Sequence, residues 1–133
     1  MGGTDVTIVV KNIKEIGHYQ GDHAIAGLRF RPVRQAMEVT AWGMNVLEFD
    51  PSCAGYPEHD HVTDGQEEVY VVLEGSIVLV AGGVERALKQ GDMARVPPNV
   101  ARKFVTRGEA ATLLALGSTP GRAYAPDPSM STT

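Results

Sequence analysis

Glycine and proline recur at short intervals along this chain, and this spacing limits it to short extended segments. The 133 residues contain 15 glycines and 8 prolines, and the runs between them are rich in valine, leucine, isoleucine and threonine. Aliphatic and β-branched runs between turn residues are typical of β-strands. No segment carries a sustained helical period. The pattern therefore predicts an all-β sandwich or barrel.

Nine runs are expected to form strands, with one helical turn at most, over 33–39. The strands are residues 6–10, 27–30, 39–49, 67–73, 76–81, 84–89, 93–96, 102–106 and 111–116. Gly82-Gly83 supplies the positive φ angles of a tight hairpin, and Glu74-Gly75 and Gln90-Gly91 are expected to form two further turns. The run 69–73 is apolar at both parities, so one face would fill the barrel and the other would meet a second sheet or a partner subunit.

Length and charge narrow the class of protein. A chain of 133 residues is near the usual size of one domain, so we expect a single domain over 1–133, with a barrel core over 39–116 and an extended tail over 117–133 anchored by Tyr124. A formal charge of −4 disfavours nucleic-acid binding. No apolar run is long enough to span a membrane, and no signal peptide is recognised, so a cytoplasmic protein is expected. The one cysteine, Cys53, excludes an intrachain disulfide.

One segment carries recognisable chemistry. His59 and His61 are two residues apart, so an extended backbone places both imidazoles on one face. A carboxylate from the following strand would complete a two-histidine, one-carboxylate set, which suits Fe(II) and also Mn, Zn or Ni. Glu67 and Glu68 are adjacent and point to opposite faces, so only one of them can join the histidines. Because a surface strand can also carry two histidines, a metal-free pocket is the alternative.

These residues resemble the first motif of the cupin superfamily, in which His-x-His precedes a glutamate that lies six residues before a glycine. Six residues separate Glu68 from Gly75, which selects Glu68 as the motif carboxylate. The gap after His61 is longer than is usual in the family, so Glu67 stays open as the alternative. Gln66 is a further candidate, either as a metal ligand or as a residue that orients a bound water.

The resemblance continues over about residues 39–116 and implies a double-stranded β-helix, or jelly-roll, cupin barrel that is commonly a homodimer with a divalent metal site. In the second motif, Gly91 is followed by Pro97-Pro98-Asn99 and then by Arg102, where the family usually has its last histidine ligand. A guanidinium stays protonated and cannot bind a metal.

Three interpretations of Arg102 are open. It would grip an anionic group of the substrate beside a three-ligand metal, or pair with Glu68 so that no metal binds, or face outward as surface charge. Phe104 shares its face and is the better core residue, which favours an inward Arg102. Tyr70 shares parity with Glu68, and we expect it to line the same cavity.

The resemblance implies a fold and a site but not a reaction. The first hypothesis is a metal-dependent oxygenase, isomerase or cyclase acting on a small, anionic molecule, with Tyr70 and Arg102 at the substrate. The second is a non-catalytic module that binds or senses a small ligand. The third is a metal-free enzyme in which a histidine is the general base. His18 and His23 lie in a polar stretch and could fold over the barrel mouth to supply a fourth ligand.

Overall fold

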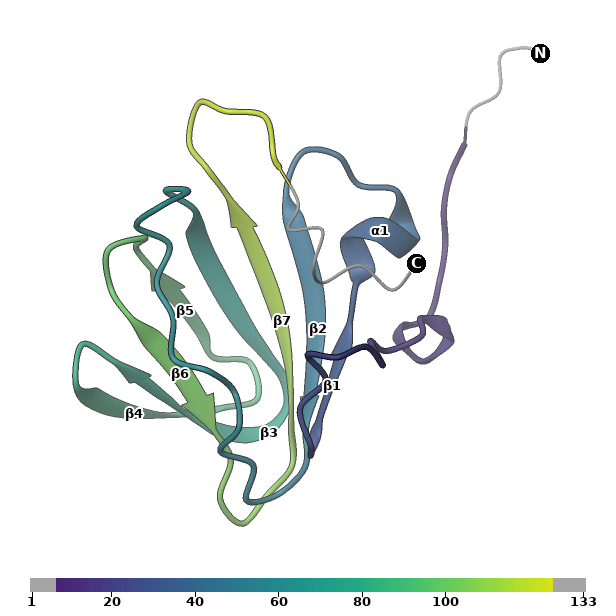
Figure 1. Ribbon diagram of the computed structural model, residues 1–133. Coiled ribbons are helices and arrows are strands. Elements are labelled where there is room, and N and C mark those ends of the chain that lie inside the picture. The colour runs from purple at the N-terminus through teal and green to yellow at the C-terminus, as the bar shows by residue number, and fades with distance from the viewer. Residues whose placement is uncertain (1–6, 126–133) are drawn as a thin grey trace.

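Seven antiparallel strands form one bent sheet that folds over itself around the core. The computed structural model describes residues 7–125. The sheet has the order β1-β2-β7-β3-β4, and β5 and β6 also pair with β3. Figure 1 shows β1, β2 and β7 on one side and β4, β5 and β6 on the other, joined through β3. The strands are β1 (Leu28–Arg31), β2 (Gly43–Phe49), β3 (Glu67–Ala81), β4 (Val84–Lys89), β5 (Met93–Val96), β6 (Arg102–Val105) and β7 (Ala111–Ser118). The predicted all-β jelly-roll fold is confirmed.

The long strand β3 connects the two sides of the barrel. Its first half pairs with β5 and β7, and its second half pairs with β4 and β6. A bulge between Val72 and Glu74 separates the halves, and Gly75 adopts a φ of 76°. A Cβ on Gly75 would overlap the carbonyl oxygen of Ala110. The turn predicted at Glu74-Gly75 is therefore wrong, because the glycine bends one continuous strand instead of ending it.

The strands β4 and β5 begin and end where the turn residues predict. The hairpin at Gly82-Gly83 joins β3 to β4, and the predicted bounds of β4 and β5 are confirmed. The strand expected over residues 6–10 is wrong where it is described, because residues 7–10 belong to no strand, and Val6 lies outside the described residues.

The main core lies between the two sides of the barrel. Its fully buried aromatic and aliphatic side chains alternate along the strands and include Phe49 on β2, Tyr70 and Val72 on β3, Phe104 on β6 and Leu113 on β7. Alternation of this kind places every second side chain on the inner face of the sheet.

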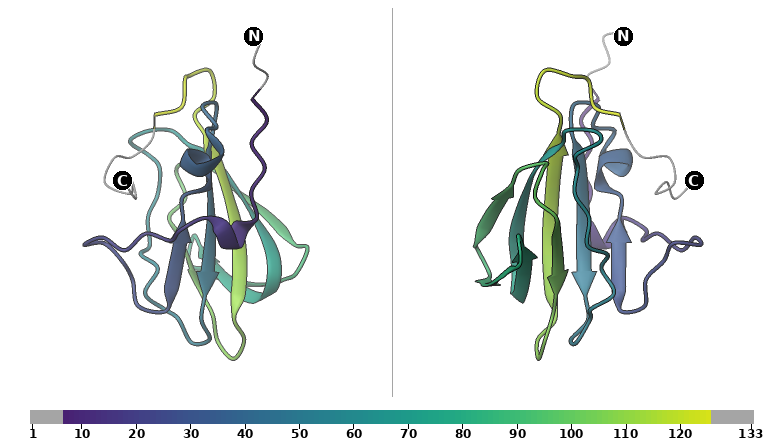
Figure 2. Two further views of the ribbon diagram at one scale, coloured as in Figure 1. Left: turned by 90° about the vertical axis from the view of Figure 1, so that its right-hand side faces the viewer. Right: turned by 60° about the vertical axis from the view of Figure 1, so that its left-hand side comes forward.

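The outer face of β2 carries a second, smaller cluster, in which Val46 packs against Ile16 and Val33. Ile16 directly follows the 3₁₀ turn η1 (Ile13–Glu15), and Val33 begins the short helix α1 (Val33–Met37). Both elements lie beside β1 and β2 in Figure 2. The single helical turn expected over 33–39 is thus confirmed, and Glu38 ends it with a φ of 61°. None of the helices between residues 7 and 125 is long and apolar enough to cross a membrane.

A buried charge fastens the N-terminal segment to the outside of the sheet. The Glu48 side chain is only 4% exposed and accepts hydrogen bonds from Lys14 (2.7 Å), Arg29 Nε (3.0 Å) and Arg31 Nη2 (2.9 Å). Burial raises the pKa of Glu48, but the three cationic donors outweigh it and lower the pKa from 4.5 to about 2. Glu48 is therefore ionised in the folded protein at neutral pH.

Candidate metal centre and cavity

The backbone before β3 positions the two histidines. Residues 57–61 lie beside the start of β6, where the His59 N–H donates to the Arg102 carbonyl (3.0 Å) and the Arg102 N–H donates back to His59 (2.9 Å). The His61 N–H donates to the Pro98 carbonyl (2.9 Å). The extended segment thus sends both imidazoles to one side, as the spacing predicts, and that side faces β3.

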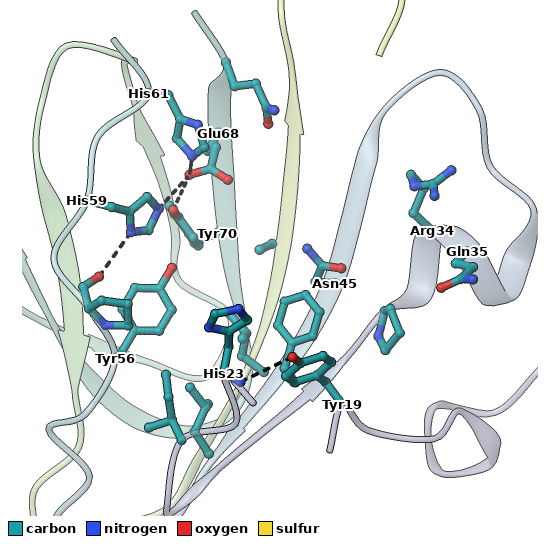
Figure 3. A pocket seen from close by; sticks show the side chains of 18 of the residues that line it. Tyr19, His23, Arg34, Gln35, Asn45, Tyr56, His59, His61, Glu68 and Tyr70 are labelled. Carbon is teal, nitrogen blue, oxygen red and sulfur yellow. Dashed lines mark hydrogen bonds and ion pairs between the residues drawn. The ribbon is translucent and has the colours of Figure 1, made fainter. Parts of the chain in front are cut away.

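His59, His61 and Glu68 form one group whose candidate ligand atoms all lie within 4.8 Å of one another. Figure 3 shows the two imidazoles turned toward the carboxylate. Glu68 Oε1 lies 3.1 Å from His61 Nε2 and 3.9 Å from His59 Nε2. Glu67 points to the opposite side of β3, where it pairs with Arg95 on the surface. The structure therefore brings Glu68, and not Glu67, to the histidines.

The other nitrogen of each imidazole has its own acceptor. His59 Nδ1 lies 3.1 Å from the Pro57 carbonyl, and His61 Nδ1 lies 3.0 and 3.2 Å from the Asp64 carboxylate oxygens. An N–H at Nδ1 leaves the Nε2 lone pair free, and metal-binding histidines are usually held in this way. Both free lone pairs then face Glu68.

The surroundings of His61 Nε2 show whether a cation fits between the histidines and Glu68. It is buried, it has no hydrogen-bond partner among the described residues, and the carboxylate oxygen opposite lies 3.1 Å away. A lone pair facing a carboxylate needs a cation between them, either a proton or a metal ion. The adjacent Glu68, followed by Asp64, raises the pKa of His61 and so favours a positive charge at this place. The donor set therefore fits a divalent metal.

Arg102 lies beneath the carboxylate rather than in the cavity. Its side chain is completely buried, and Nη1 donates to Glu68 Oε1 at 2.6 Å. Nη2 donates to the Pro97 carbonyl (2.7 Å) and Nε to the Val100 carbonyl (3.0 Å). The interpretation in which Arg102 faces outward is thus wrong, and the ion pair with Glu68 is present. Because Arg102 does not line the cavity, its geometry suits positioning Glu68 better than gripping a substrate.

The pairing with Arg102 leaves one oxygen of the Glu68 carboxylate available. Tyr70 also donates its hydroxyl to Oε1, whereas Oε2 accepts no hydrogen bond from residues 7–125. Burial raises the pKa of Glu68, but His61, Tyr70 and Arg102 outweigh it, so the pKa lies below its ordinary value. Glu68 therefore stays ionised and keeps one oxygen for a ligand.

The remaining sequence candidates surround this group. Tyr70 lines the cavity, as its parity predicts, and its ring packs on Phe104 at 4.7 Å. Gln66 also lines the cavity, but its amide donates to Asp64 (3.2 Å) and it lies outside the three-residue group. His23 lines the cavity without joining the group, and His18 does not line it.

Tyr56 is a cavity residue that sequence reasoning missed. Its ring lies 5.6 Å from the His59 imidazole and 5.8 Å from the Phe104 ring. Burial is the main cause that raises the pKa of both Tyr56 and Tyr70, so both phenols are protonated at neutral pH. The only available signal was an aromatic residue three positions before the first histidine.

The group opens into a cavity of about 860 Å³. Its middle is apolar, with Leu28, Phe30, Leu47 and Ala115 on the sheet. Beyond this wall lie polar residues from several segments: Tyr19, His23, Arg34, Gln35, Asn45 and Tyr124. A cavity of this size and mixed lining is typical of a small-molecule site.

Comparisons with solved structures identify proteins of the same fold. A sugar phosphate isomerase from a cupin superfamily of Silicibacter pomeroyi is 22% identical, with 82% of this chain and 75% of that chain covered and a TM-score of 0.66. A predicted oxalate decarboxylase from Thermotoga maritima is 20% identical, with coverage of 84% and 99% and a TM-score of 0.68. The polyketide cyclase RemF from Streptomyces resistomycificus is 18% identical, with coverage of 92% and 89% and a TM-score of 0.71.

At these identities the likeness establishes the fold alone. A search of curated proteins finds no match. The sequence itself carries the family assignment, because residues 45–117, more than half of the chain, match the cupin domain family. The match begins within β2, ends within β7 and includes the His59, His61 and Glu68 group. By fold and by sequence, the chain therefore belongs to the cupin domain family.

Proposed function

We propose that this protein binds a divalent metal ion through His59, His61 and Glu68 and is an enzyme that acts on a small molecule in the adjoining cavity. The observation that carries the proposal is the orientation of the two imidazoles. Each Nδ1 has an acceptor of its own, and each Nε2 is turned toward an ionised carboxylate. Three ligands leave coordination positions for substrate or water, as catalytic metal sites require.

The ligand chemistry suits Fe(II), Mn, Zn or Ni. Such an ion supplies a Lewis acid that polarises a substrate oxygen. The Tyr56 and Tyr70 phenols are protonated and line the cavity beside the group. The Tyr70 hydroxyl donates its proton to Glu68, so Tyr56 is the phenol that can donate a hydrogen bond to a bound molecule. Arg102 positions the carboxylate, and its adjacent positive charge makes this a weaker metal site than one with a histidine in its place.

For the reaction we propose a group of three classes rather than a single one. An oxygenase, isomerase or cyclase acting on a small oxygen-containing molecule suits the cavity and the open coordination positions. Neighbours of the same fold are described as an isomerase, a predicted decarboxylase and a cyclase, which supports small-molecule chemistry without choosing among reactions.

One observation favours a second candidate function. The Arg102–Glu68 ion pair already compensates the carboxylate, which is the arrangement expected of a cupin that binds a small ligand without a metal. The two functions differ in catalysis and in whether the protein binds metal stoichiometrically, and metal content is the property that can be measured without knowing the substrate.

Elemental analysis of the tag-free protein tests the proposal, with titration of EDTA-dialysed protein by Fe(II), Mn²⁺, Zn²⁺ and Ni²⁺ as the second arm. His59→Ala is the test variant. His18→Ala is the control, because His18 lies outside the cavity and the ligand group. We expect near-stoichiometric metal in the wild type and the control and a loss in His59→Ala. No uptake by the wild type, or equal uptake by both variants, would overturn the metal site.

A further inference from the structure

The far end of the cavity carries a positive charge. Arg34, from α1, is the one arginine or lysine that lines the cavity among the described residues. Figure 3 shows it on the opposite side of the cavity from His59, His61 and Glu68. Neither the ligand group nor the family match accounts for it, since Arg34 precedes residues 45–117.

The Arg34 guanidinium is held in place without a neutralising carboxylate among the residues that the structure describes. Nη1 donates to the Val39 carbonyl at 3.1 Å, and the guanidinium carbon lies 5.6 Å from the centroid of the Tyr124 ring. Within residues 7–125, Arg34 forms no ion pair with a carboxylate. Five other arginines do so: Arg29, Arg31, Arg95, Arg102 and Arg107. A guanidinium has five N–H donors, so the Val39 carbonyl leaves most of them for a ligand.

The Tyr124 ring, on which the Arg34 guanidinium packs, is itself positioned by a distant part of the chain. Gly43, at the start of β2, leaves room for Tyr124, because a Cβ there would lie 2.6 Å from the Tyr124 hydroxyl. An arginine fixed by an aromatic face and a backbone carbonyl loses little side-chain entropy on binding. The geometry thus presents a preorganised cation to the cavity.

A second polar group lies on the same wall. Asn45 lines the cavity on β2, next to the apolar Leu47 and Ala115, and its side-chain amide makes no hydrogen bond within residues 7–125. Small-molecule sites combine an apolar lining with a few polar groups that fix the orientation of the ligand, and a side-chain amide in such a lining can pair with a bound molecule.

We propose that Arg34 binds a carboxylate or phosphate of the substrate and that Asn45 contacts the body of the same molecule. The substrate is then a small acid that carries its anionic group at one end and oxygen donors at the other. Planar guanidinium groups bind both kinds of anion through paired hydrogen bonds. The inference rests on the proposed function only for the oxygen-donor end, which would face His59, His61 and Glu68.

The experiment measures anion binding by the full chain as purified. The probes are inorganic phosphate and sodium benzoate, and the signals are calorimetric heat and the Nε–H resonance of Arg34 in ¹⁵N NMR. Arg34→Gln removes the charge and Arg34→Lys keeps it without the planar fork. Arg86→Gln is the matched control, since Arg86 is exposed on β4 and has no ion pair in the described part of the chain.

We expect saturable binding of at least one probe, and the probe that binds identifies the anion as phosphate or carboxylate. The dissociation constant should rise about tenfold or more in Arg34→Gln, rise less in Arg34→Lys and stay unchanged in Arg86→Gln. Wild-type affinity in Arg34→Gln, or no saturable binding of either probe, would overturn the proposal. Thermal unfolding of each variant confirms that it is folded.

The same titration on His59→Ala separates this inference from the metal site. If Arg34 holds the anion, His59→Ala binds the probe with wild-type affinity even after its metal is lost. If affinity falls in His59→Ala and not in Arg34→Gln, the anion is bound at the ligand group, and the Arg34 subsite is wrong while the metal site stands.

Discussion

Replacing Arg102 by methionine is the most demanding test of how the site is supported. Methionine keeps much of the apolar volume but removes the charge that compensates Glu68. It also leaves the Pro97 and Val100 carbonyls without their donors. Removing one partner of a buried ion pair costs about 3–5 kcal/mol, and each unpaired carbonyl adds to that cost. We therefore expect Arg102→Met to lower the free energy of unfolding by at least about 3–5 kcal/mol.

The adjacent glutamate supplies a matched control. Arg95 pairs with Glu67 as Arg102 pairs with Glu68, but the Arg95 side chain is 60% exposed and the Arg102 side chain is fully buried. Exposed pairs contribute about 0–1 kcal/mol, so Arg95→Met should change stability by less than about 1 kcal/mol.

Urea unfolding at pH 7, followed by circular dichroism, measures both variants against the wild type. Equal decreases in the free energy of unfolding for Arg102→Met and Arg95→Met would mean that Arg102 is not the buried partner of Glu68. The assignment of Arg102 as a positioning residue would then be wrong.

Three other substitutions probe the support of His61, the buried charge of Glu48 and the bend at Gly75. Asp64→Asn removes the charge that holds His61 Nδ1, so the Zn²⁺ dissociation constant measured by calorimetry should rise about 10- to 100-fold. Glu48→Gln should lower the free energy of unfolding at pH 7 by about 3 kcal/mol, since the Glu48 pKa falls from 4.5 to about 2. A lowered pKa stabilises the folded state above about pH 4.5, and this stabilisation disappears toward pH 2, so the variant should approach the wild type in urea unfolding at pH 3. Gly75→Ala should cost about 3 kcal/mol in thermal unfolding, because a positive φ and an overlap with a backbone carbonyl act together, whereas Gly82→Ala, with the same sign of φ and open space, should cost about 1 kcal/mol.

Each of these has a matched control or a contradicting result. Asp60→Asn is the control for Asp64→Asn, since the Asp60 side chain accepts from the Val62 N–H rather than from a histidine. A constant stability deficit for Glu48→Gln between pH 7 and pH 3 would show that the Glu48 pKa is not lowered. Equal costs of Gly75→Ala and Gly82→Ala would show that the Ala110 carbonyl does not restrict position 75.

The sequence predicts the strands best where glycine or proline turns end them. The bounds of β4 and β5 are correct because Gly82-Gly83 precedes β4, Gln90-Gly91 separates it from β5, and Pro97-Pro98 follows β5. The same reasoning fails at Gly75, because a glycine with positive φ serves a bulge as well as a turn, and only the register with β7 distinguishes the two.

The candidate site was predictable to the extent that it depends on local spacing. Parity along an extended chain is sufficient to place His59 with His61 and to send Glu67 and Glu68 to opposite faces. The Arg102–Glu68 contact depends on the pairing of β6 with the segment 57–61, which spacing alone does not determine. The position of Arg34 was not predicted, because it depends on how the segment between β1 and β2 and the chain near Tyr124 cover the cavity.

Anomalous diffraction from a Zn²⁺-soaked crystal of the full chain tests directly whether His59, His61 and Glu68 bind a metal ion. We expect one peak at the zinc edge, within about 2.0–2.2 Å of Nε2 of His59, Nε2 of His61 and a carboxylate oxygen of Glu68. Arg102 should still donate to the other oxygen of that carboxylate. A cavity without a peak, in which Glu68 contacts only Arg102, Tyr70 and a protonated His61, would rule out the metal site and favour a metal-free binding site.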